Sequence, residues 1–255
     1  PSGLSVLVCD AAPAPLSRHS RCGCASTLAF EFSHGEHCLI VNCGGAALAG
    51  GQVPARIEQG LRASAAHSTL ILGDANSTAV ELNGALGKGV TQVEVDRQPL
   101  DLGHGGRSDG SRSDGSGGGS RSGMRLELAH DGYGARFGLR HRRVLVLRDD
   151  GRELLGEDSV ESVGRRVRSG KIDFAIRFHL GPNVDPRLAE GGLEAELLCP
   201  DGSVWLFESE ERPITVEESL WVDGGGRPHP IGQLVIGGLA SRGGASFGWR
   251  LVKTG

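Results

Sequence analysis

Short segments of alternating apolar and polar residues recur along the whole chain, and turn-forming sequences separate them. In TLAFEF, for example, Leu28, Phe30 and Phe32 fall on one side of an extended chain. The intervening SHGE, DDGR, PDGS and DGGGRP are rich in residues that form tight turns. Only GQVPARIEQGLRASAAH comes near a helical period, and it carries a proline and glycines. This spacing predicts an all-β fold, a large and mostly antiparallel β-sandwich of many short strands.

The composition of the chain suits such a sandwich. Among its 255 residues are 42 glycines and 11 prolines but only one tyrosine, so Val, Leu, Ile and Ala must build most of the core. Residues 103–123 repeat the unit RSDGS and contain almost nothing apolar, which is typical of a segment that cannot pack. We therefore expect one domain over residues 1–255, with a flexible Gly/Ser-rich insert at 103–123.

The charge and the hydropathy pattern argue against two classes of partner. A net charge of −4 and a pI of about 6.2 predict no basic surface for nucleic acid or anionic lipid. No apolar run is long enough to cross a bilayer as a helix. The chain begins with Pro1 and shows no leader sequence, so we expect it to be a piece or a processed product of a longer protein.

Two thiols stand directly before the strand segment LAFEF. Six cysteines are too few for a disulfide-built scaffold of this length, so reduced thiols are expected. Cys22 and Cys24 are two residues apart, and an extended chain would place them on the same face. His67 stands at the entrance to a later strand segment, after a run of small residues.

Four sequence blocks between residues 20 and 180 occur in a recognisable order: ASTLAFEFSHGEHCLIVNCG, LRASAAHSTLILGDANS, AHDGYGARFGLRHRRVLVL and FAIRFHL. This ordered set resembles the β-rich C-terminal part of heparinase II/III-like polysaccharide lyases. The resemblance implies one half of a two-part enzyme, whose other half is an upstream (α/α) toroid absent from this chain. It implies β-elimination in an acidic, uronic-acid polysaccharide, and a periplasmic location.

The resemblance also assigns roles to individual positions. The family commonly has His-x-His before the strand that reads LAFEF here, and these two places fall on Cys22 and Cys24. Many relatives have aspartate where this sequence has Asn42, and they share the histidine kept here as His67. The resemblance implies that Cys22 and His67 occupy catalytic positions. It implies that Cys24, Asn42 and His67 occupy the positions of the ligands of a zinc ion. With the predicted strands, it also implies that Cys22, Cys24 and His67 converge at one end of the sandwich, with Asn42 nearby.

Cysteine at both histidine positions leaves three interpretations open. The thiols are zinc ligands in place of imidazoles, or small packing groups in a domain that has lost its chemistry, or Cys22 is a nucleophile with His67 as its base. The function predicted first is therefore that of a lyase β-domain that contributes to cleavage of a uronic-acid glycan. The alternative is a non-catalytic carbohydrate-binding or structural module with a degenerate active site.

Overall fold

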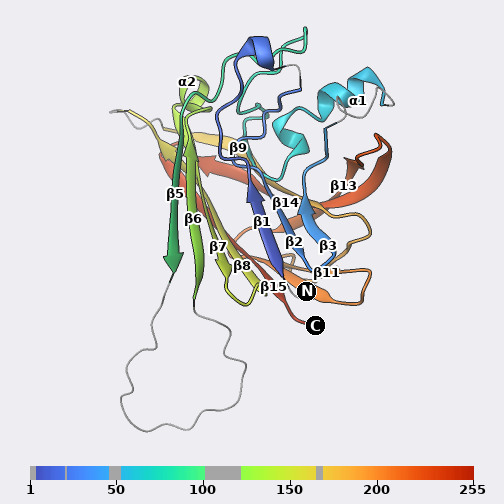
Figure 1. Ribbon diagram of the computed structural model, residues 1–255. Helices are drawn as coiled ribbons and strands as arrows, with labels where there is room; N and C mark the ends of the chain where they lie inside the picture. The colour runs from blue at the N-terminus through green and yellow to red at the C-terminus, as the bar shows by residue number, and fades with distance from the viewer. Residues whose placement is uncertain (1–3, 21, 46–52, 101–121, 165–168) are drawn as a thin grey trace, which may run out of the picture.

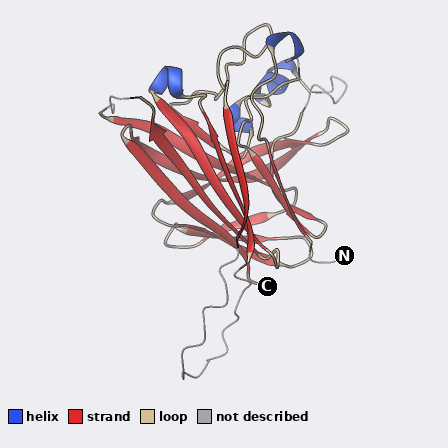
Figure 2. Cartoon of the chain, turned by 60° about the vertical axis from the view of Figure 1, so that its left-hand side comes forward, coloured by secondary structure: helices blue, strands red, loops and turns tan. Residues whose placement is uncertain are grey.

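The structure is a computed structural model, and it describes residues 4–20, 22–45, 53–100, 122–164 and 169–255. In this part of the chain the strands form two antiparallel sheets that pack face to face (Figure 1). Short helices gather with long loops at one end of the sheets, which we call the loop end (Figure 2). The predicted all-β sandwich is confirmed.

The first sheet has seven strands and places the predicted site residues. Its order is β1-β2-β3-β9-β14-β13, with β4 also paired to β9. The strands are β1 (Ser5–Cys9), β2 (Phe30–His34), β3 (His37–Val41), β4 (Leu70–Leu72), β9 (Lys171–Leu180), β13 (Ile214–Val222) and β14 (Pro228–Ser241).

The second sheet has eight strands in the order β10-β11-β12-β15-β8-β7-β6-β5. They are β5 (Val93–Leu100), β6 (Gly123–His130), β7 (Leu139–Arg148), β8 (Glu153–Ser162), β10 (Asp185–Leu188), β11 (Glu194–Leu198), β12 (Val204–Ser209) and β15 (Gly244–Lys253). β5 and β6 pair up to Leu100 opposite Gly123. The insert expected at 103–123 thus joins two paired strands, and all but its last two residues lie outside the described part of the chain. The one-domain interpretation of residues 1–255 stays a prediction.

Helices are few and short among the described residues. They are α1 (Ala55–Gly60), α2 (Gly134–Phe137) and the 3₁₀ turns η1 (Ser17–His19) and η3 (Ser64–Ala66). α1 and η3 both fall within the one segment that showed a helical tendency in the sequence. None of the described helices has the length and apolarity that crossing a membrane requires.

Large aromatic side chains from both sheets fill the space between them. Phe30 of β2 stacks on Trp249 of β15 with ring centroids 5.6 Å apart, and Phe178 of β9 meets Phe207 of β12 at 4.7 Å. Each of these rings is at most 3% exposed. Alternation along the strands brings them inward, and each buried ring contributes about 2–3 kcal/mol by leaving water. These contacts fix the two sheets against each other and so set the loop end.

Candidate functional site

Cys22 and Cys24 lie in a turn at the loop end and not in an extended chain. The N–H of Gly23 donates to the carbonyl of Ser20 at 2.9 Å, and strand β2 begins only at Phe30. Leu28 is fully buried with φ of 65°, a left-handed conformation that a leucine rarely adopts. The predicted extended approach is therefore wrong, because buried contacts of the loop override the alternating pattern at this point.

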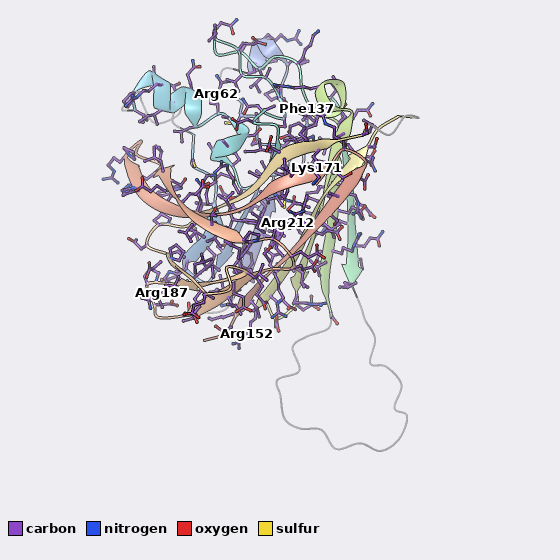
Figure 3. The ribbon with its side chains drawn as sticks, turned by 180° about the vertical axis from the view of Figure 1, so that it is seen from behind. Arg62, Phe137, Arg152, Lys171, Arg187 and Arg212 are labelled. Atoms are coloured by element: carbon purple, nitrogen blue, oxygen red, sulfur yellow. The ribbon has the colours of Figure 1, made fainter. Side chains whose placement is uncertain are left out.

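A buried arginine holds this turn. The guanidinium of Arg62 donates to three carbonyls, those of Gly23 at 2.7 Å, Ser20 at 2.8 Å and Gly84 at 2.5 Å. Arg62 is 6% exposed and lies beside α1 at the loop end (Figure 3). Because the carbonyls of Ser20 and Gly23 flank Cys22, the guanidinium fixes the backbone that carries the thiols.

The two thiols differ in exposure. Cys22 is exposed, whereas Cys24 is partly buried and its Sγ lies 3.9 Å from the carbonyl oxygen of Cys22. Burial raises the pKa of Cys24, and the nearby Arg62 guanidinium opposes that rise only in part. The Cys24 thiol is therefore protonated at neutral pH, which disfavours it as a metal ligand or a nucleophile. All six cysteines are free.

His67 presents the clearest chemical group of the predicted set. Its ring follows η3, is 5% exposed, and its Nδ1 lies 2.8 Å from the carbonyl oxygen of Ala63. A carbonyl only accepts, so Nδ1 carries the proton and Nε2 keeps its lone pair. Burial lowers the pKa of His67, and this keeps the ring neutral. His67 therefore has the tautomer that a proton acceptor or a metal ligand requires.

Asn42 lies next to His67 through the backbone, but its amide is already engaged. Its Oδ1 accepts the N–H of Ser68 at 2.9 Å, and its Nδ2 donates to Glu31 Oε1 at 3.1 Å. The first bond ties the end of β3 to the backbone directly after His67, and the second ties it to β2. Asn42 therefore supports the segment that carries His67.

The donor set fits zinc poorly in this arrangement. Among the described residues, no three His, Cys, Asp or Glu side chains form a group that could hold a metal ion. The oxygen of Asn42 already accepts one hydrogen bond, and the contacts of the described residues include none between the thiol of Cys22 and His67. The zinc interpretation and the nucleophile interpretation of Cys22 both stay predictions.

A second buried imidazole adjoins His67 and received no role from sequence reasoning. His179 of β9 has Nε2 3.0 Å from the carbonyl oxygen of Ala65, so Nε2 donates and Nδ1 accepts. Ser219 Oγ lies 2.8 Å from Nδ1, and Cys43 Sγ lies 3.5 Å from it. Burial, followed by the neighbouring His67, lowers the pKa of His179 to about 3. The signal in the sequence was only its place at the end of FAIRFHL.

A fully buried ion pair joins two neighbouring strands of the second sheet, and its arginine also contacts the loop end. Arg143 of β7 grips Asp158 of β8 through two bonds, Nε to Oδ1 at 2.8 Å and Nη2 to Oδ2 at 3.0 Å. His141 and Trp249 donate to the same carboxylate at 2.7 and 3.0 Å. Burial alone would raise the pKa of Asp158, but Arg143 and His141 outweigh it and hold that pKa below its ordinary range.

Arg143 also contacts the segments that lead into strands β2 and β4 of the first sheet. Its Nη1 donates to the carbonyl of Leu28 at 2.7 Å and to the carbonyl of Ser68 at 2.8 Å. Leu28 ends the turn that carries Cys22 and Cys24, and Ser68 directly follows His67. One buried guanidinium therefore sets the distance between the two segments in which the predicted site residues lie.

Comparison with known proteins identifies the family of this fold. Residues 2–250 match the family described as heparinase II/III-like, C-terminal. The chain belongs to this family. It is also 27% identical over 253 residues to FtsZ-localized protein C of Caulobacter vibrioides, and the match covers 97% of this chain but 40% of that protein. The chain thus spans well under half the length of this curated relative.

Solved structures show the same fold. The heparan sulfate lyase HepC from Pedobacter heparinus matches with a TM-score of 0.67 at 13% identity, over 98% of this chain and 33% of that one. A heparinase III with methylated lysines matches with a TM-score of 0.67 at 13% identity, over 97% of this chain and 32% of that one. The heparinase-like chain is therefore a lyase-related β-domain that corresponds to about a third of these enzymes.

Proposed function

We propose that this domain forms one wall of a polysaccharide lyase cleft, with His67 facing a uronic-acid glycan. The other wall is a toroidal domain, supplied by the rest of the same polypeptide or by a separate chain. The chemistry is β-elimination: the C5 proton is removed, the sugar carboxylate is neutralised, and the leaving oxygen at C4 takes up a proton.

The state of His67 is the observation that carries this proposal. Its Nδ1–H is committed to the carbonyl of Ala63, which leaves Nε2 of this buried ring as an acceptor. The lowered pKa keeps that nitrogen unprotonated through the neutral range. Nε2 can therefore accept a proton or a hydrogen bond from a bound sugar. The family membership and the heparinase-like fold supply the reaction class.

Bracing of this site favours a chemical role over simple packing. His67 is flanked by Asn42, by the buried His179 and by the carbonyl contacts of Arg143 at Ser68. Such fixed surroundings reduce the reorganisation that a proton transfer requires. The exposed Cys22 takes the place at which relatives carry their first histidine, so its thiol would face the same ligand.

The proposal is tested by comparing this chain with the complete gene product that contains it. Both are incubated with a panel of uronic-acid polysaccharides, and the ultraviolet absorbance of the unsaturated uronate product is followed. We expect product from the complete protein and none from residues 1–255 alone, because only one wall of the cleft is present. Robust activity of the isolated domain would show that the sandwich needs no second wall.

A second candidate is a non-catalytic glycan-binding or structural module. Two observations favour it: the Cys24 thiol is held protonated, and the relative from Caulobacter vibrioides is named for its localisation with FtsZ and not for an enzymatic reaction. In this case the complete protein would bind acidic glycans without forming unsaturated product. Equilibrium binding measured beside the absorbance assay separates the two candidates.

A further inference from the structure

A polar pocket lies at the end of the sandwich opposite His67, where the turns after β7 and β11 meet the end of β15. It has a volume of about 600 Å³, and its polar lining comes from His34, Asp150, Arg152, Asp201, Ser203 and Lys253. Figure 3 shows Arg152 at this end and Arg62 at the loop end. The 10 residues of β15 alone span about 33 Å, so the pocket is separate from the candidate site.

Two cationic residues, Arg152 and Lys253, line this pocket. The backbone N–H of Lys253 donates to the carbonyl of Arg152 at 2.9 Å, which brings the two neighbouring strand ends together. The ammonium of Lys253 lies 3.3 Å from Nε2 of His34, and that is a contact through one of its three protons. Lys253 also attracts the Asp201 carboxylate of the same pocket and helps to lower its pKa, and an ammonium with three protons can still donate to a ligand.

A chain of hydrogen bonds fixes the direction in which these groups point. Lys253 donates to Nε2 of His34, so Nδ1 carries the proton and donates to Ser5 Oγ at 2.8 Å. The hydroxyl of Ser5 in turn donates to the carbonyl of Gly151 at 2.5 Å. The His34 ring also packs edge-on against the buried Trp205 with centroids 5.2 Å apart. These contacts fix the His34 ring, and the ring in turn holds the ammonium of Lys253 in place.

The acidic lining of the pocket balances these cations. Asp201 accepts the N–H and the hydroxyl of Ser203 at 3.0 and 2.7 Å, and its other oxygen lies 3.3 Å from His37 Nε2. A carboxylate has about four lone-pair sites, so Asp201 keeps capacity to accept from a ligand hydroxyl. The pocket therefore offers fixed cations and fixed acceptors within the same space.

We propose that this pocket binds a carboxylated sugar unit of an acidic glycan. The carboxylate would pair with Lys253 and Arg152, and the ring hydroxyls would donate to Asp201 and to other acceptors of the lining. A bare inorganic anion would leave these acceptors unused, and a neutral sugar would leave the two cations unpaired. The choice of glycan rests on the proposed function, and the pocket would hold the polymer at a point remote from His67.

The test measures binding of a uronic-acid oligosaccharide to the 255-residue chain by titration calorimetry. Lys253→Met is compared with Lys171→Met, which removes the same charge from an exposed strand position near the loop end. We expect Lys253→Met to weaken binding by about tenfold or more, because a charge-assisted hydrogen bond is lost. Lys171→Met and the charge-conserving Lys253→Arg should remain within about twofold, and a neutral oligosaccharide should bind far more weakly.

Three outcomes would overturn the proposal. Tight binding of the acidic oligosaccharide that survives Lys253→Met and Arg152→Gln would place the glycan elsewhere and leave the proposed function intact. Absence of any measurable binding to the chain would remove the pocket site, while elimination by the complete protein would still support the lyase. If sulfate or inorganic phosphate competes with the oligosaccharide at equal concentration, the pocket binds an anion without recognising the sugar.

Discussion

Lowering the pH from 7.5 to 5.5 is expected to destabilise this domain through its buried, neutral histidines. His130 and His179 are both 2% exposed. Burial lowers the pKa of His179 to about 3 and holds the pKa of His130 well below its usual range. Both rings are neutral in the folded chain at pH 5.5, whereas they become protonated when the chain unfolds. Stability is therefore lost as the pH falls below the unfolded pKa.

The magnitude follows from the proton linkage. At one pH unit below the unfolded pKa, each such group costs about 1.4 kcal/mol. His130 and His179 together lower the free energy of unfolding by about 3 kcal/mol, and His67 and His141 add losses of the same sign because burial lowers their pKa as well. Typical domains have about 5–15 kcal/mol in total, so the change is large.

Urea unfolding followed by circular dichroism at pH 7.5, 6.5 and 5.5 measures this loss. The buried Asp158 carboxylate has a lowered pKa, so its contribution is lost only in more acidic solution and does not enter this window. His179→Gln should reduce the pH dependence by about 1.4 kcal/mol, whereas the exposed control His19→Gln should leave it unchanged. A free energy of unfolding that stays constant from pH 7.5 to 5.5 would refute the reasoning.

Two further predictions concern the site. Arg143→Met leaves Asp158 as a buried unpaired charge and should lower the free energy of unfolding by about 3–5 kcal/mol. Its control, Arg142→Met on the outer face of the same strand, should lower that free energy by at most about 1 kcal/mol, and equal losses in urea unfolding would contradict the prediction. Protein purified without chelator should contain well below one zinc per chain by metal analysis, because among the described residues no three His, Cys, Asp or Glu side chains form a group that could hold the ion; one equivalent that disappears in Cys24→Ala would establish the thiol as a ligand.

Alternation and turn residues were sufficient to predict the sandwich. The block AHDGYGARFGLRHRRVLVL ends within β7, whose inward positions include His141 and Arg143 as well as Leu145. A pattern based on apolar residues cannot show that a buried arginine is paired, because its partner Asp158 comes from the next strand. The buried charged pair that contacts the loop end could therefore not be predicted from the sequence.

The candidate site was predictable only in part, for a related reason. His67 lies where a strand entrance was expected, and the resemblance to the family pointed to it. The turn at Cys22 was missed because it depends on carbonyl contacts of Arg62, forty residues away, and on the left-handed Leu28. The two hydrogen bonds of Asn42 were not predicted, because its partners Ser68 and Glu31 are distant from it in sequence. Long-range hydrogen bonds to the backbone leave no local pattern.

The most direct test of the account is the elimination rate of the complete gene product with and without the His67 imidazole. The formation of unsaturated uronate is followed by absorbance for the unchanged protein, for His67→Gln and for the matched control His19→Gln, with folding verified by circular dichroism. The account predicts product from the unchanged protein and from His19→Gln, and a loss of at least about 100-fold in His67→Gln, as for removal of a general acid–base group. Undiminished product from His67→Gln, or no product from the unchanged protein on any uronic-acid glycan, would contradict it.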